Sequence, residues 1–575
     1  MALVCYQRLL QTLTTGLLLI VIGCPATYAQ DLKLVAPKKL ESNAKPIEVP
    51  TDVSLQEVKS SDPQRIILKR LTGLIFLRTP EKVLKNGINM EGILTDGYMP
   101  ESFFKEMNVF LNEPLSLEKL NDMLKSVVVY FRSQSTPVVD VYVPEQDITG
   151  GTIQIVVREG HVGEIRVEGN EWFESEMIAK QVRAKPGDPI RGNMLAEDIN
   201  KINKNPFRRV DLVLIRGEEQ GKTDVVLRTE DRFPLRLYGG YENTGTGNTG
   251  YDRYFAGLNW GNAFGLGHLL DYQFTSSDNY KSMNAHSLHY ELPISYRQTI
   301  NFFAAYAESN PNLDPYDLEA ESFELSARYI LDLDPTEKYL HSVFLGVDYK
   351  FSNSNLGFSA SPVFNKDVEI LQVIAGYNGS LPDGLGMTAF NLQAVVSPGN
   401  LLRYNTDEYF NNYQEGASAD YLYCNLDIDR LTTLPFGFAL SNKAHGQLAN
   451  GQLLGSEQIG LGGYSTIRGF PEREVNIDSG LLLRNEILTP SLSLADFMNY
   501  QKDLGMLQLL AFWDYGFGRN DYIDRNETLS GYGLGLRYNF GSNISLHLDY
   551  GIQDCGKDIA LGANSRLHLG LVIAY

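Results

Sequence analysis

The chain has little cysteine, no long apolar segment and no excess of positive charge. Of the four cysteines among 575 residues, only Cys424 and Cys555 follow the N-terminal region, and two are too few for a disulfide framework. After the N-terminal region, no segment approaches the roughly 18 consecutive apolar residues of a membrane helix. Lysine and arginine number 50 against 70 acidic residues, for a net charge of -20. Nucleic-acid binding needs a basic footprint, so we expect no nucleic-acid partner.

Glycine and aromatic residues are abundant, with 52 glycines and 11% aromatics. The mean hydropathy of -0.20 suits a soluble protein, but it also suits a membrane barrel, because barrel strands alternate apolar and polar residues. If the chain enters a membrane, it therefore enters as strands. The length of 575 residues predicts two to four domains.

The N-terminus has the parts of a secretory signal. Arg8 precedes an apolar run at 17–22, and the small-residue site 27–29 predicts a signal peptide over residues 1–29. A lipoprotein signal with a lipidated Cys24 is the alternative. Residues 30–65 contain prolines without a helical period and are predicted to be a flexible N-terminal leader.

Two α/β units are predicted to follow, at 66–160 and 161–232. Each has the order strand, helix, helix, strand, strand, and this repeat matters more than any single motif. The first unit has the longer spacing between its first strand and first helix, where 80–99 is a predicted insertion. The predicted strands are 71–77, 138–143, 152–157, 162–168, 210–215 and 224–228. The predicted helices are a short one opened by Pro100, one through 117–131, and two at 174–183 and 194–202.

From residue 233 to 575 the period changes to two residues, which predicts antiparallel strands. The last strand alternates most clearly, with leucines, Ile573 and Tyr575 on one face and His568 on the other. At about 21 residues per strand and connection, the stretch accommodates roughly sixteen strands. The predicted fold class is therefore α+β repeats followed by an all-β transmembrane barrel.

We expect no disulfide bond, metal site or catalytic site in the mature chain. Cys424 is predicted on the apolar face of a strand and Cys555 in a polar loop at 553–558, so a bridge between them is not expected. The pair Asp427 and Asp429 could bind calcium, but carboxylates lining a wet lumen are the favoured interpretation. No serine, cysteine or metal constellation assembles a catalytic site, so we expect no enzyme activity, metal or cofactor.

Two short stretches stand out within the predicted barrel. The first, 460–470, contains four glycines in ten residues and a single charged residue, Arg468. Glycine lets a backbone fold closely against another surface. The second is Phe512-Trp513-Asp514-Tyr515-Gly516, where Asp514 is the only charge on an otherwise apolar strand. We expect Arg468 to pair with Asp514.

These stretches resemble the motifs of a known family. Ile467-Arg468-Gly469-Phe470 is similar to the loop motif of outer-membrane transporters with periplasmic POTRA domains, and Phe512-x-Asp514-x-Gly516 is similar to their strand motif. The segment with Pro144, Gln146 and Gly150 resembles the end of the first POTRA domain in the TpsB transporters of two-partner secretion. Asn205-Pro206 resembles a turn of their second POTRA domain, and Tyr575 resembles the C-terminal barrel insertion signal.

The resemblance implies a domain order and a function. It implies a POTRA domain at 66–160, a second at 161–232 and a barrel at 233–575, in a Gram-negative outer membrane with the POTRA domains in the periplasm. These domains would recognise a secreted partner exoprotein, and the barrel would export it while the Arg468 loop acts as a gate. Outer-membrane lipid, periplasmic chaperones and the barrel assembly machinery are further implied partners.

Two other functions stay open. An assembly factor of the same superfamily, which inserts other outer-membrane proteins, is the main alternative, and the number of POTRA units argues against it. An uptake channel or adhesin barrel is the third, in which the repeats would have no role.

Overall fold

The computed structural model describes residues 32–40, 42, 62–97, 99–219, 221–247, 249–313, 316–336, 339–358, 361–555 and 564–575. The predicted signal peptide, Cys24 and most of the predicted leader lie outside these residues. Contacts divide the chain into two compact units. One comprises Met1–Leu40, Leu235–Phe264 and His268–Tyr575, and the other comprises Glu41–Pro234 and Gly265–Gly267.

The first α/β domain builds a four-stranded sheet in the order β3-β2-β6-β5. Strands β2 and β6 are parallel, and β5 and β6 are antiparallel. The core forms where one face of α3 packs on the sheet, and it includes the fully buried Phe103 and Val127. Ser116 caps α3 by accepting a hydrogen bond from Lys119 N at 3.2 Å. The elements are β1 (Ile66–Leu68), β2 (Gly73–Leu77), η3 (Pro80–Lys82), β3 (Gly92–Thr95), α2 (Glu101–Asn108), β4 (Leu115–Ser116), α3 (Leu117–Ser133), β5 (Val139–Tyr142) and β6 (Thr152–Glu159).

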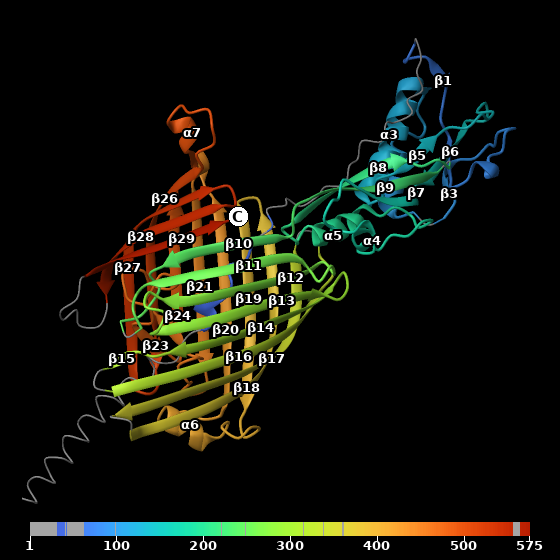
Figure 1. Ribbon diagram of the computed structural model, residues 1–575. Coiled ribbons are helices and arrows are strands. Elements are labelled where there is room, and N and C mark those ends of the chain that lie inside the picture. The colour runs from blue at the N-terminus through green and yellow to red at the C-terminus, as the bar shows by residue number, and fades with distance from the viewer. Residues whose placement is uncertain are drawn as a thin grey trace, which may run out of the picture. The chain divides into compact units, whose positions relative to one another are not determined.

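The second domain repeats this topology in a three-stranded sheet, β7-β9-β8. Strands β7 and β9 are parallel, and β8 and β9 are antiparallel, so β7, β8 and β9 correspond to β2, β5 and β6. The predicted repeat is present (Figure 1). The elements are β7 (His161–Glu168), α4 (Ser175–Ala179), α5 (Gly192–Ile202), β8 (Arg208–Arg216) and β9 (Lys222–Asp231).

The two domains differ at two places from the sequence-based expectation. The stretch 80–99 contains β3, which pairs in parallel with β2 and covers its edge. The helix expected over 174–183 ends at Ala179. Arg183 instead turns to Asp198 of α5, which accepts hydrogen bonds from its backbone N at 2.9 Å and its side-chain Nε at 2.6 Å.

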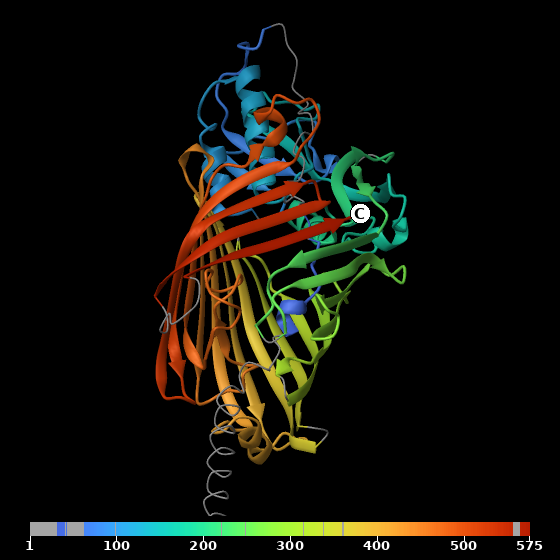
Figure 2. The ribbon, with the colours of Figure 1, turned by 60° about the vertical axis from the view of Figure 1, so that its left-hand side comes forward.

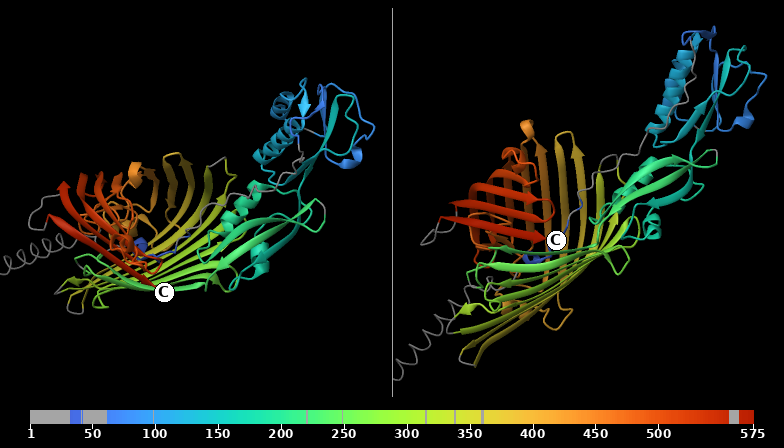
Figure 3. Two further views of the ribbon diagram at one scale, coloured as in Figure 1. Left: turned by 90° about the horizontal axis from the view of Figure 1, so that it is seen from above. Right: turned by 45° about the horizontal axis from the view of Figure 1, so that its top comes forward.

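The unit that contains Leu235–Phe264 and His268–Tyr575 is a closed barrel of sixteen long antiparallel strands, as predicted. Figure 1 labels these strands, and Figure 3 follows them around the wall. The strands are β10 (Leu235–Glu242), β11 (Arg253–Ala263), β12 (His268–Ser277), β13 (Met283–Pro293), β14 (Gln298–Ser309), β16 (Tyr316–Asp332), β17 (Leu340–Phe358), β18 (Ser361–Asp383), β19 (Gly386–Pro398), β20 (Asp420–Thr433), β21 (Ala439–Ala449), β24 (Ser479–Leu488), β26 (Met506–Asn520), β27 (Arg525–Phe540), β28 (Ile544–Cys555) and β29 (Ser565–Ala574).

Short elements occupy the connections between these strands. They are β15 (Asn312–Leu313), α6 (Asp407–Tyr413), η4 (Pro435–Gly437), β22 (Ile459–Leu461), β23 (Val475–Ile477), β25 (Leu492–Ser493) and α7 (Leu494–Phe497). Among the residues that the structure describes, none of the helices combines the length and apolar content that a bilayer crossing requires.

The barrel strands carry apolar side chains outward and polar side chains inward. On β29, Leu567 is 44% and Ile573 53% exposed, whereas His568 is fully buried. This is the predicted alternation. Cys424 and Cys555 are both free and exposed. The loop prediction for Cys555 is wrong, because it is the last residue of β28, which runs on through the polar residues of 553–555.

Part of the predicted flexible leader packs against the barrel wall instead. Leu32–Val35 forms a short 3-10 helix, η2, which lies beside β12, β13 and β14 (Figure 2). Leu32 and Val35 are buried with apolar side chains of the wall, and Ser287 Oγ donates a hydrogen bond to Val35 O at 2.6 Å. Lys38 then pairs with Glu242 at 2.6 Å. These contacts order residues that have no helical period of their own.

Candidate functional site

The site is the long connection between β21 and β24, here called the lumen loop (residues 450–478). Strands β22 and β23 pair as a hairpin within it. Ile467 and Phe470, on either side of Arg468 and Gly469, are buried with apolar side chains of this hairpin and of the strands β24 and β27. The tip of the loop is thus held against the barrel by an apolar cluster.

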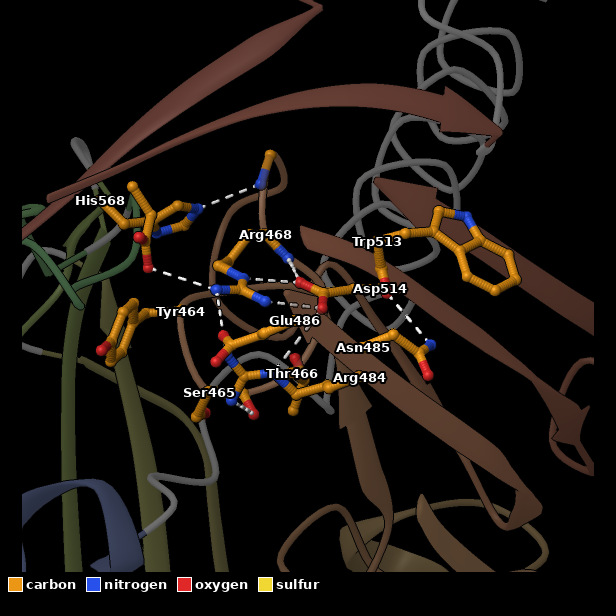
Figure 4. A network of polar contacts seen from close by, with 12 residues as sticks. Tyr464, Ser465, Thr466, Arg468, Arg484, Asn485, Glu486, Trp513, Asp514 and His568 are labelled. Carbon is orange, nitrogen blue, oxygen red and sulfur yellow. Dashed lines mark hydrogen bonds and ion pairs between the residues drawn. The ribbon is translucent and has the colours of Figure 1, made fainter. Parts of the chain in front are cut away.

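Arg468 is the centre of the polar contacts of this loop, and its side chain is fully buried. Its Nε lies 2.7 Å from Asp514 Oδ2 and its Nη2 2.8 Å from Asp514 Oδ1, so the contact is bidentate. Its backbone N also donates to Asp514 Oδ2 at 3.1 Å. Nη1 donates to Glu486 Oε1 at 2.6 Å and lies 3.4 Å from Asp549 Oδ2 (Figure 4). The expected pairing of Arg468 with Asp514 is present.

Gly469 brings the backbone of the loop onto the barrel wall. Its φ of 99° lies in a region that glycine adopts without steric cost, and a Cβ there would lie 3.1 Å from the carbonyl carbon of Gly551. Gly469 N donates to His568 Nε2 at 3.1 Å (Figure 4), and Gln553 Nε2 donates to Gly469 O at 2.8 Å. The loop thereby contacts β28 and β29.

Phe512 and Gly516 shape the surface on either side of Asp514. The Arg468 guanidinium carbon lies 3.6 Å from the centre of the Phe512 ring, a cation-π contact. A Cβ on Gly516 would lie 2.5 Å from Ile467 Cδ1, so the missing side chain makes room for Ile467. In the strand motif, Phe512 therefore stacks on Arg468, Asp514 pairs with Arg468, and Gly516 leaves room for Ile467.

The sequence did not identify the other charged residues of this site. Arg484 lies 3.8 Å from Asp514 Oδ1, and Arg537 pairs with Asp549 at 2.6 Å. With Glu486, the cluster contains three arginines and three carboxylates. Strand alternation offered a signal for Asp549, since it shares a face with His547 on the last hairpin.

The burial of Arg468 and Asp514 raises the free-energy cost of separating them. An ion pair that stays exposed to water contributes only about 0–1 kcal/mol to stability. The structure instead buries both side chains completely. Removing one partner of a buried pair costs about 3–5 kcal/mol, because the other charge is left uncompensated. The Arg468 contacts therefore hold the loop firmly.

The motif residues of the POTRA domains stabilise turns. The side-chain amide of Gln146 makes the two hydrogen bonds to β6 that the backbone of a neighbouring strand would make. Its Nε2 donates to Gln154 O at 2.6 Å, and its Oε1 accepts from Gln154 N at 2.8 Å. The turn after Pro144 places Gly150 against the inserted stretch, where a Cβ would lie 3.0 Å from Ile88 O. Asn205 Oδ1 accepts from Phe207 N at 3.0 Å and closes the turn through Pro206.

Sequence comparisons identify relatives of this chain. The family model of the haemolysin secretion/activation protein ShlB/FhaC/HecB matches residues 221–538, and that of POTRA, the surface antigen variable number repeat, matches residues 161–226. The heme/hemopexin transporter protein HuxB of Haemophilus influenzae is 24% identical over 87% of this chain and 84% of its own length. The outer membrane transporter CdiB of Dickeya dadantii is 23% identical over 66% of this chain and 67% of its own.

Solved structures share the fold. CdiB from Escherichia coli superposes with a TM-score of 0.71 at 16% identity, covering 92% of this chain and 94% of that chain. CdiB from Acinetobacter baumannii gives a TM-score of 0.62 at 16% identity, covering 96% and 99%. The family models therefore place a POTRA domain at 161–226 and the transporter family at 221–538 in one chain, and the solved structures share its fold. The chain belongs to the ShlB/FhaC/HecB family of TpsB transporters of two-partner secretion.

Proposed function

We propose that this protein recognises a partner exoprotein with its POTRA domains and exports it through the barrel, with the lumen loop as the movable part of the pore. The observation that carries the proposal is the loop itself. It folds back onto the barrel wall through the buried contacts of Arg468 with Asp514, so it occupies space that a passing polypeptide needs.

The POTRA domains would lie in the periplasm and receive the client. Sheet edges bind extended peptides by strand addition, in which backbone hydrogen bonds tolerate varied side chains. The edge strands of the first sheet, β3 and β5, are four residues long each. Those of the second sheet, β7 and β8, have eight and nine residues and offer more backbone groups to a client. The second domain is therefore the better candidate for strand addition.

Export is tested by expressing the chain together with a candidate client and measuring that client in the medium. A secreted protein encoded by a neighbouring gene is the candidate to try first. We expect wild-type to secrete it and Arg468→Ala to lose most secretion while the barrel still inserts. Arg519→Ala is the control for loss of an arginine, since Arg519 at the end of β26 is exposed and pairs with Asp521 at 2.7 Å and Asp524 at 2.6 Å. Undiminished secretion by Arg468→Ala would contradict the role of the loop.

The assembly-factor alternative makes a different prediction. Depleting an insertase lowers the amount of other outer-membrane proteins, whereas deleting a secretion transporter leaves them unchanged and removes one protein from the medium. A general loss of outer-membrane barrels on deletion would favour the alternative. As further partners of this transporter we propose outer-membrane lipid, periplasmic chaperones and the barrel assembly machinery.

A further inference from the structure

A second set of buried contacts holds the lumen loop at another part of the wall. Glu457 precedes β22, and its side chain is 1% exposed. Its Oε1 lies 2.7 Å from Lys350 Nζ of β17. Its Oε2 accepts from Tyr423 Oη of β20 at 2.9 Å and from Gln372 Nε2 of β18 at 3.2 Å. The carboxylates around Arg468 lie on β24, β26 and β28, so the two attachments share no strand.

The wall around Glu457 keeps its own charge balance. Arg328 Nη1 lies 2.6 Å from Asp348 Oδ1, and Lys350 interacts electrostatically with both Asp348 and Glu324. Without Glu457, two cations and two carboxylates would remain. Gln372 would keep its bond to Asp348 at 3.0 Å. Departure of Glu457 therefore breaks the ion pair of Lys350 but leaves the four charges of Arg328, Lys350, Glu324 and Asp348 balanced.

The wall around Arg468 does not keep such a balance. Without Arg468, the arginines 484 and 537 would face the three carboxylates Glu486, Asp514 and Asp549. Among the described residues, Asp514, which is fully buried, would retain Arg484 as its one ion-pair partner, at 3.8 Å. An uncompensated buried charge is strongly destabilising. The two attachments thus differ in what their release leaves behind, although both are buried.

We propose that Glu457 is the release point of the lumen loop and Arg468 its permanent attachment. On opening, the loop breaks its contacts to Lys350, Gln372 and Tyr423 and pivots about the Arg468 cluster, which stays intact. This inference rests on the proposed function, since it assumes that the loop moves when a client passes.

The segment next to Glu457 is also joined to α6. Leu453 and Leu454 are buried with Phe410 of α6. Gln414, which follows α6, donates from Nε2 to Leu453 O at 3.0 Å and accepts at Oε1 from Gly455 N at 3.2 Å. These bonds join the segment 453–455 to the β19–β20 connection, so the two move together when Glu457 is released.

Two covalent locks test the proposal in the full chain, with Cys424→Ser and Cys555→Ser because both native thiols are exposed. The first lock joins Glu457→Cys to Lys350→Cys with bis-maleimidoethane. The second is a disulfide between Ile467→Cys and Gly516→Cys, positions in direct contact. Secretion of the client is measured before and after locking. N-ethylmaleimide, which blocks thiols without joining them, is the control for the first lock, and reduction is the control for the second.

We expect the first lock to abolish secretion. For the second lock, we expect secretion by the oxidised variant to equal secretion by the same variant in its reduced form. Secretion that continues through the first lock, or that is lost only when the second is oxidised, would overturn the proposal. If the wild-type chain secretes no client, the proposed function fails, and this is seen before any lock is tested. If wild-type secretes and the locks behave otherwise than expected, only the release point fails.

A second measurement needs no crosslink and covers the case in which a cysteine pair fails to fold. Glu457→Gln keeps the size of the side chain and removes its charge, so channels of the purified protein in a planar bilayer should open more often than wild-type channels. The control is Glu474→Gln, an exposed glutamate of the same loop, which should leave the opening frequency unchanged. Equal opening frequencies for Glu457→Gln and wild-type would contradict the proposal.

Discussion

The POTRA domains and the barrel use the same residue types in opposite places. In the POTRA unit, Phe76, Phe103 and Ile155 are at most 2% exposed and form the core. In the barrel, Leu345 is 57% and Leu534 69% exposed on the outer face, while charged side chains are buried on the inner face. The solvent explains the difference, because water surrounds one unit and lipid surrounds the wall of the other. Burial alone therefore does not tell a core from a lumen.

The largest expected effect is on the apolar core of the first domain. Phe103→Ala removes a fully buried ring that lies 4.9 Å from the ring of Phe76, and we expect about 3–5 kcal/mol of lost stability for that domain. Limited proteolysis of the purified protein should cut the POTRA region faster and leave the barrel intact. Equal proteolysis rates for the variant and wild-type would contradict the packing.

The next largest effect is expected from a charge placed on the outer face of the barrel. Leu345→Arg on β17 places a charge toward lipid, which costs about 2–4 kcal/mol near the middle of the bilayer. The urea concentration at which half of the barrel is unfolded, measured from the band of folded protein in gels, should be lower than for wild-type. Gln393→Arg on β19 is the control, because this position faces the lumen, where a charge remains solvated. Similar losses for both variants would show that the two faces do not differ as described.

A smaller effect tests the fit of the loop to the wall. Gly516→Ala inserts a methyl group where a Cβ would lie 2.5 Å from Ile467 Cδ1, and overpacking of this kind costs about 1–3 kcal/mol. Reduced secretion with normal insertion is expected. Gly446→Ala on β21 is the matched control, since its nearest neighbours would lie 3.9 Å away. A defect of equal size in both variants would exclude a specific fit.

The smallest effect is a pH dependence in the POTRA unit. Asp147 accepts a hydrogen bond from Thr149 N at 2.9 Å, which holds the pKa of its carboxyl group below the ordinary value. A lowered pKa stabilises the fold above the unfolded value of about 3.9, and this contribution disappears as the pH falls through the folded value. Asp147→Ala should therefore lower the thermal midpoint of the POTRA unit slightly at pH 7. Its difference from wild-type should vanish at acid pH.

Strand and helix order were predictable from periodicity, because each unit repeats its pattern over many residues. The pairing of Arg468 with Asp514 was predictable because each was the only charge in its stretch. Glu457, Lys350 and Glu486 were not, since their sequence neighbourhoods carry other polar residues and only barrel closure brings them together. The inner packing of 32–40 escaped prediction for a similar reason, since its contacts come from strands more than two hundred positions away.

The seam between β10 and β29 has a kinetic consequence. It joins groups 326 positions apart in the chain, such as Leu569 N and the Asn243 side chain, whereas most other neighbouring strands are consecutive hairpins. Local hairpins form quickly, but a contact at such separation has to wait for a slow ring closure. Until then both strands expose unpaired backbone groups, and these invite aggregation. Closing the ring is therefore the step at which we expect the folding chain to depend most on help from other proteins.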